Sequence, residues 1–133
     1  MLLGLDTRFF ISHHNQHPRA LAIWSEYTVG NHVLVISTLS LNELFTYFIK
    51  RNLLTVAEEW LYQMHTAPDI RLVDVSSEIA AQAARYRLGL QLPTVDAIIL
   101  TTFLLQRCDL MMTTDSHFQI VQQQNLIPVE YLT

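Results

Sequence analysis

Short apolar segments alternate along this chain with longer segments whose apolar residues recur every three or four positions. The short segments predict buried strands, and the longer ones predict amphipathic helices. The predicted strands are Leu2 to Leu5, Val33 to Ser37, Arg71 to Val75, Leu110 to Asp115 and Pro128 to Leu132. We expect the third strand at an edge of the sheet because it is more polar, and the fifth because proline cannot donate to a central ladder.

The alternation of strands and helices implies parallel pairing with right-handed crossovers. The sequence therefore predicts an α/β fold, a three-layer α/β/α sandwich with a central five-stranded parallel sheet. Repeats, low-complexity segments and linkers are absent, so we expect one domain over residues 1–133. A domain of this length buries roughly two-thirds of the surface of its unfolded chain, enough for a substantial core.

Four carboxylates occupy matching places in this pattern. Asp6 directly follows the first strand and Asp115 ends the fourth, while Glu43 and Asp96 lie near the starts of two predicted helices. Sites in such sheets lie beyond the carboxyl ends of the strands, so we expect the four acids to meet there. Crowded carboxylates must take up protons or hold a cation, and oxygen ligands select Mg²⁺ or Mn²⁺ over zinc.

Two of these acids also have local explanations. Ser40-x-x-Glu43 matches a capping box, in which the glutamate only bonds back to the helix start. Asp96 in a first helical turn interacts favourably with the helix dipole in any case. Each segment by itself leaves both explanations open, but four acids at one edge favour a common site. A cation held there neutralises a phosphate oxygen and activates a water, which points to a phosphodiester substrate.

The four acids lie in the segments LLGLDT, STLSLNEL, LPTVDAIIL and MMTTDSHF. With these segments in this order, the chain resembles PIN domains, and more narrowly the small VapC-type toxin ribonucleases. The resemblance covers essentially the whole chain. It implies the strand order three, two, one, four, five. It also implies Mg²⁺- or Mn²⁺-dependent hydrolysis of single-stranded RNA by an activated water, without a covalent intermediate.

The resemblance also implies roles for individual residues. Asp6, Glu43, Asp96 and Asp115 match the acidic residues that hold the metal and act in catalysis. Thr113 matches a small hydroxyl residue that orients a water or Asp115. For partners, the resemblance implies an RNA substrate, a homodimer and a small inhibitory antitoxin protein.

The composition limits the kinds of binding surface that we expect. The net charge of -4, with only 8 Lys and Arg residues, argues against a broad basic face for nucleic acid. Half of the residues are hydrophobic, which suggests an apolar partner or dimer surface. No apolar run reaches the roughly 18 residues of a membrane span. Cys108 is the only cysteine, so we expect it to be a buried small side chain in a chain of the reducing cytoplasm.

Some features remain open at this level. His13, His14 and His17 share a helical spacing, but no nearby carboxylate or cysteine completes a metal site, which favours a solvated loop or helix end. Lys50 and Arg51 suit the end of a helix or a phosphate contact. Two alternatives to the nuclease are a non-catalytic PIN-like protein-binding module and a receiver-like phosphoacceptor domain. The receiver is disfavoured because no lysine follows Lys50.

Overall fold

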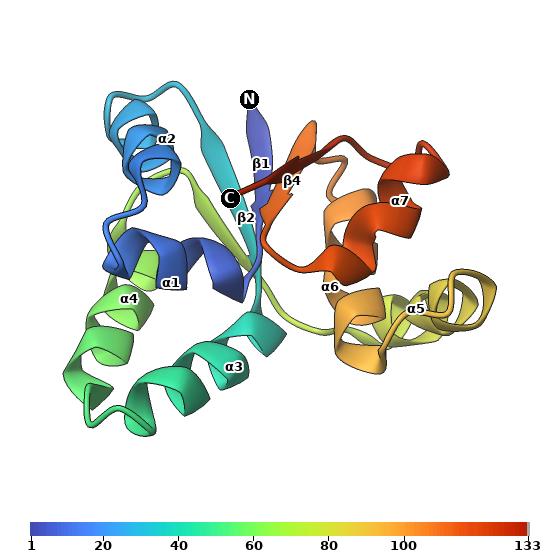
Figure 1. Cartoon of the computed structure of the whole chain (residues 1–133), viewed down its shortest axis with the longest axis horizontal. Helices are drawn as coiled ribbons and strands as arrows, with labels where there is room; N and C mark the ends of the chain where they lie inside the picture. The colour runs from blue at the N-terminus through green and yellow to red at the C-terminus, as the bar shows by residue number, and fades with distance from the viewer. Residues whose placement is uncertain (133) are drawn as a thin grey trace.

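A parallel five-stranded sheet forms the centre of the molecule (Figure 1). The computed structural model describes residues 1–132, so Thr133, the last residue of the predicted domain, lies outside the described residues. The strands are β1 (Leu2–Leu5), β2 (Val33–Ser37), β3 (Ile70–Val73), β4 (Leu110–Thr113) and β5 (Val129–Tyr131). Their order in the sheet is β3-β2-β1-β4-β5, which confirms the predicted architecture and the implied strand order.

Helices cover both faces of this sheet, in two groups that follow chain order (Figure 1). One face packs against α1 (Thr7–His14), α2 (Pro18–Thr28), α3 (Thr38–Ile49) and α4 (Leu54–Thr66). The other face packs against α5 (Ser77–Gly89), α6 (Thr94–Leu105), the 3-10 helix η1 (Ser116–Phe118) and α7 (Gln119–Gln123). The three layers of the predicted sandwich are therefore present.

Alternating side chains of the central strands supply the two halves of the core. In β1, Leu3 and Leu5 are fully buried against the α1–α4 layer. Gly4, between them, faces the opposite layer, where an added Cβ would lie only 2.6 Å from the ring of Phe103. The absence of a side chain at Gly4 thus lets α6 pack directly onto the central strand.

Local boundaries differ from the prediction in three places. The third strand is Ile70–Val73 rather than Arg71 to Val75. The fourth strand ends at Thr113, because Asp115 caps η1 instead of continuing the ladder. The fifth strand is Val129–Tyr131 rather than Pro128 to Leu132.

No single helix in residues 1–132 has the length and hydropathy of a membrane span. Helices α5 and α6 reach that length and hydropathy only as a pair bent by 118°.

Candidate metal centre

The carboxyl ends of β1 and β4 bring Asp6 and Asp115 to the same edge of the sheet. These strands are paired neighbours, with Leu5 opposite Met112. Asp6 ends its strand by capping α1, its Oδ1 accepting a hydrogen bond of 2.9 Å from the Arg8 N–H. Asp115 caps η1 in the same way, its Oδ1 accepting from the His117 N–H at 2.9 Å. Each cap fixes the carboxylate where the chain leaves the sheet.

Thr113 connects these two acids through its hydroxyl group. The Thr113 Oγ1 donates a hydrogen bond of 2.5 Å to Asp6 Oδ2 and accepts one of 3.0 Å from the Asp115 N–H. Thr113 is fully buried, and the side chain of Asp6 is nearly so. One hydroxyl therefore links the side chain of Asp6 to the backbone of Asp115.

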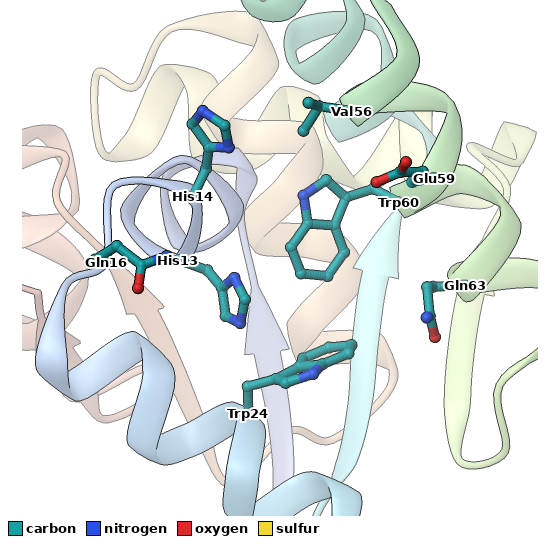
Figure 2. A pocket seen from close by; sticks show the side chains of 8 residues that line it. All are labelled: His13, His14, Gln16, Trp24, Val56, Glu59, Trp60 and Gln63. Carbon is teal, nitrogen blue, oxygen red and sulfur yellow. The ribbon is translucent and has the colours of Figure 1, made fainter. Parts of the chain in front are cut away.

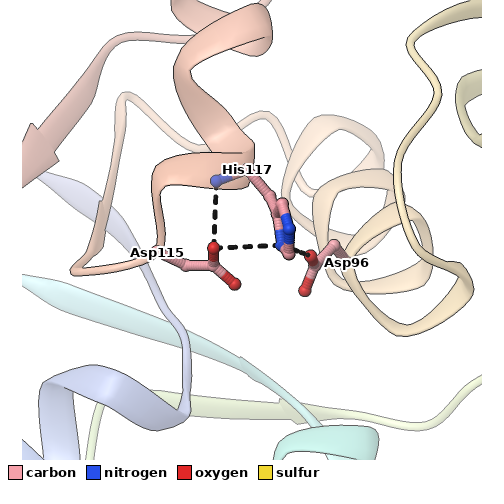
Figure 3. A group of neighbouring side chains, drawn as sticks. All are labelled: Asp96, Asp115 and His117. Carbon is pink, nitrogen blue, oxygen red and sulfur yellow. Dashed lines mark hydrogen bonds and ion pairs between the residues drawn. The ribbon is translucent and has the colours of Figure 1, made fainter.

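Asp96 approaches Asp115 from the opposite side, from the first turn of α6. Between the two carboxylates lies the imidazole of His117, with its Nδ1 3.0 Å from Asp96 Oδ2 and 3.1 Å from Asp115 Oδ1 (Figure 3). One ligand atom from each of these three residues lies within 4.8 Å of the other two. Among residues 1–132 this is the group that matches the spacing of metal ligands.

Glu43 lies on α3 and is not part of a capping box. Helix α3 begins at Thr38 with Ser37 as its N-cap, so Ser40 lies within the helix and is buried. Glu43 instead accepts a hydrogen bond of 2.9 Å at Oε1 from the hydroxyl of Thr7, the residue after Asp6. The local explanation of Glu43 as a cap is therefore excluded.

Burial is the largest influence on the pKa values of Asp6 and Asp96. Burial raises the pKa of Asp6 from 3.8 to about 7, with a further rise from the charge of Glu43; the hydrogen bonds from Thr113 and Arg8 oppose the rise. Burial and the charges of Asp115 and Glu43 also raise the pKa of Asp96. In the described chain, no Lys or Arg forms an ion pair with any of these four acids. A cation at this edge would offset the unbalanced negative charge, so the donor set fits a divalent metal.

The acids predicted from the sequence thus fall into connected subsets. Asp96 and Asp115 belong to the close group, and Asp6 is joined to Asp115 through Thr113. Glu43 is joined to the residue next to Asp6 and interacts electrostatically with Asp6 and Asp96. That all four surround one cation stays a prediction.

His117 is the member of the close group that the sequence did not reveal. It follows Asp115 within the quoted MMTTDSHF segment, yet nothing in its spacing distinguished it from a solvent-exposed residue. Its position depends on the 3-10 turn after β4, which directs the ring back toward Asp115 and on to α6 (Figure 3). The available signal was a histidine two residues after the aspartate that follows the fourth strand, where a tight turn brings both side chains together.

The histidines of the first helix lie elsewhere. His13 makes edge-to-face contacts with the rings of Trp24 and Trp60, at centroid distances of 5.7 Å and 5.1 Å. These rings line a cavity of about 360 Å³ (Figure 2). His14 packs against Phe48, and His17 caps α2 by accepting from the Arg19 N–H at 3.1 Å. His13 and His14 form the last turn of α1, which confirms the expected helix end, but both rings are half-buried rather than solvated.

A match to a family model shows the family of this chain. Residues 4–123 match the model described as PIN domain, which is most of the chain. The chain belongs to the PIN domain family. This match spans all four candidate acids as well as Thr113 and His117. A comparison with curated proteins found no significant match to this chain.

Several solved structures share this fold. VapBC2 from Rickettsia felis, bound to a DNA fragment from its promoter, is 17% identical with a TM-score of 0.74, covering 100% of both chains. A toxin–antitoxin complex from Klebsiella pneumoniae is 21% identical with a TM-score of 0.70, covering 90% of this chain and 91% of that one. VapC20 from Mycobacterium tuberculosis, a toxin that cleaves the sarcin–ricin loop, is 14% identical with a TM-score of 0.68, covering 92% and 95%.

Proposed function

We propose that this PIN domain protein is a metal-dependent endoribonuclease that hydrolyses phosphodiester bonds of single-stranded RNA and serves as the toxin of a toxin–antitoxin pair. The observation that supports this most is the joining of Asp96, Asp115 and Asp6 at one edge of the sheet. These acids have no Lys or Arg as ion-pair partner within residues 1–132. Such an arrangement has a simple explanation if a divalent cation completes it.

Each residue has a distinct part in this proposal. Asp96 and Asp115 hold Mg²⁺ or Mn²⁺. The carboxylates of Asp6 and Glu43 supply further negative charge around this ion. When bound, the cation neutralises a phosphate oxygen and lowers the pKa of a water. Asp6 is held beside this cation by hydrogen bonds from the Thr113 hydroxyl and the Arg8 N–H. Thr113 orients the carboxylate of Asp6 and accepts from the Asp115 N–H, and Thr7 orients Glu43.

A groove on α3 suggests where the RNA strand lies. It begins at Glu43 and ends two turns later at the exposed Lys50 and Arg51. The Arg51 guanidinium lies 3.5 Å from the centroid of the Tyr47 ring. Cations beside a half-buried tyrosine ring suit a single strand, whose phosphates interact with cations and whose bases stack on aromatic rings. This local basic groove is compatible with the net charge of -4, because it needs no broad basic face.

The proposed partners are a small antitoxin protein and a second copy of this chain. One of the similar structures is described as a toxin–antitoxin complex from Klebsiella pneumoniae, which supports the antitoxin. Large apolar side chains are exposed on several helices, including Tyr62 on α4 and Leu88 on α5. Such surfaces are available for an antitoxin or a homodimer to cover.

The test is an RNA cleavage assay on the purified chain. A mixed pool of single-stranded RNA is incubated with Mg²⁺, with Mn²⁺ and with chelator. We expect cleavage that requires a divalent metal and that falls at least a hundredfold in the Asp115→Asn variant. The matched control is Asp74→Asn, which makes the same substitution at an exposed acid outside the centre, and which we expect to retain full activity.

Two results would contradict the nuclease. Cleavage that continues in chelator, or that survives in Asp115→Asn, would exclude a role for this centre. No cleavage with any metal, from folded protein that is free of antitoxin, would favour the non-catalytic protein-binding module.

A further inference from the structure

His117 occupies the space between the two carboxylates of the close group. Its Nδ1 lies 3.0 Å from Asp96 Oδ2 and 3.1 Å from Asp115 Oδ1, and the ring points at both acids (Figure 3). The sequence-based expectation contained only oxygen ligands. The structure adds an imidazole nitrogen to the same group of donor atoms.

The position of this imidazole is set by its own turn. The backbone N–H of His117 donates to Asp115 Oδ1 at 2.9 Å, which ties the residue to the acid. The next residue, Phe118, is buried in the core and anchors η1 to the protein. The imidazole is 58% exposed and therefore not held by core packing, so its contacts with the two acids define its place.

The distances agree with adjacent ligands of one small cation. Metal–ligand bonds of about 2.1 Å at right angles place neighbouring donor atoms about 3 Å apart. The nitrogen of His117 has this separation from one oxygen of Asp96 and from one oxygen of Asp115. The three residues together offer one nitrogen and two oxygen donors.

We propose that His117 Nδ1 is a direct ligand of the cation held by Asp96 and Asp115, and that it makes the centre select Mn²⁺ over Mg²⁺. This inference rests on the proposed function only for the presence of a divalent cation. Mg²⁺ binds almost entirely through oxygen, whereas affinity for nitrogen donors rises along the transition-metal series from Mn²⁺. The competing arrangement has His117 as a positioning residue, which orients the two acids and does not touch the metal.

The decisive measurement is metal binding to the full chain in the absence of RNA. Calorimetry gives the Kd for Mn²⁺ and for Mg²⁺ with the unaltered chain, His117→Gln and His65→Gln. The last variant makes the same change at an exposed histidine on α4, as the matched control. We expect His117→Gln to raise the Kd for Mn²⁺ at least tenfold and the Kd for Mg²⁺ less than threefold, with no effect from His65→Gln.

Pulsed electron paramagnetic resonance of bound Mn²⁺ supplies a readout that needs no variant. With ¹⁵N-labelled histidine, we expect a nitrogen hyperfine coupling that disappears in His117→Gln. Equal weakening of Mn²⁺ and Mg²⁺ binding, or bound Mn²⁺ without a nitrogen coupling, would overturn the inference and leave His117 as a positioning residue.

The two proposals fail in different ways. A nitrogen coupling from a protein that cleaves no RNA would support the ligand while rejecting the nuclease. Metal-dependent RNA cleavage without any nitrogen coupling would support the nuclease while rejecting His117 as a ligand.

Discussion

At the scale of single residues, Asp6 is the most constrained group in the centre. Its side chain accepts hydrogen bonds from Arg8 and Thr113 and is 4% exposed, yet it has no ion-pair partner among the described residues. A buried carboxyl in these surroundings favours the protonated form. The ionised carboxylate of Asp6 therefore lowers the free energy of unfolding of the metal-free protein at neutral pH.

The first prediction concerns how the effect of Asp6 on the free energy of unfolding depends on pH. Because the pKa of Asp6 rises from 3.8 to about 7 on folding, the stabilisation from its proton is present below pH 4 and lost as the pH rises through 7. At pH 8 without metal, we expect Asp6→Asn to raise the free energy of unfolding, on the order of 2 kcal/mol. Urea unfolding at pH 8 and pH 4 measures this gain, which should shrink at the lower pH. A loss of stability at pH 8 would contradict the argument.

The second prediction concerns the Thr113 hydroxyl. Thr113→Val keeps the shape of this fully buried side chain and removes the hydrogen bonds to Asp6 and from Asp115. We expect the rate of RNA cleavage to fall about a hundredfold, while Thr113→Ser keeps most of it because the hydroxyl remains. The comparison is made on single-turnover cleavage rates with saturating metal. Equal activity of the valine and serine variants would show that the hydroxyl has no such role.

At the scale of elements, α6 brings Asp96 to the centre only because it lies close to β1. Phe103 of α6 is fully buried, and its ring fills the space beside Gly4. A side chain at position 4 would push the helix away from the strand that ends in Asp6. Packing within the core thus controls the separation of Asp6 and Asp96, which lie far apart in the sequence.

The third prediction tests this contact with Gly4→Ala. A Cβ at this position would lie 2.6 Å from the Phe103 ring, so the helix or the ring must move. We expect a loss of about 1 to 3 kcal/mol in the free energy of unfolding, as for other overpacked cores. Gly89→Ala is the matched control, because an added Cβ there meets nothing within 4 Å. Equal stabilities of the two variants in urea would contradict the close packing.

The elements themselves were largely predictable, and their ends were less so. The predicted strand Val33 to Ser37 agrees with β2, because an apolar β-branched run bounded by polar residues has few other solutions. Helix ends were harder, since several residues that follow helices adopt positive φ without being glycine, among them Gln91 at 55° and Arg107 at 58°. Nothing in these side chains signals a left-handed conformation.

At the scale of the whole molecule, the parallel arrangement of the strands places the acidic side chains at one edge of the sheet. The two central strands β1 and β4 end beside each other, and α3 and α6 begin at the same edge (Figure 1). The α3 groove leads away from this edge toward Lys50 and Arg51. The shape of the molecule therefore supplies both a negative centre and a short positive approach to it.

The fourth prediction concerns that approach. In chelator, where no cleavage occurs, we expect Lys50→Gln with Arg51→Gln to weaken binding of single-stranded RNA about tenfold. The slope of log Kd against log salt concentration should fall by about 1.4, since each lost phosphate contact contributes roughly 0.7.

The control for this prediction removes two other basic side chains, through Arg71→Gln with Arg107→Gln. Both residues lie near the start of a strand or just before one, at the edge of the sheet opposite the acids. Binding should remain unchanged in this pair. Equal weakening by both double variants would show that general charge, and not the α3 groove, determines RNA binding.

The sequence by itself determined the layered fold, the strand order through its resemblance to PIN domains, and the acids worth considering. These follow from hydrophobic periodicity and local motifs, which depend on residues close together along the chain. The tertiary structure decided which acids share a close group, excluded the capping box at Glu43 and introduced His117. The physical reason is that the donor atoms of the close group come from α6 and from the turn at η1 that follows β4. Their separations of about 3 Å depend on how these elements pack on the sheet.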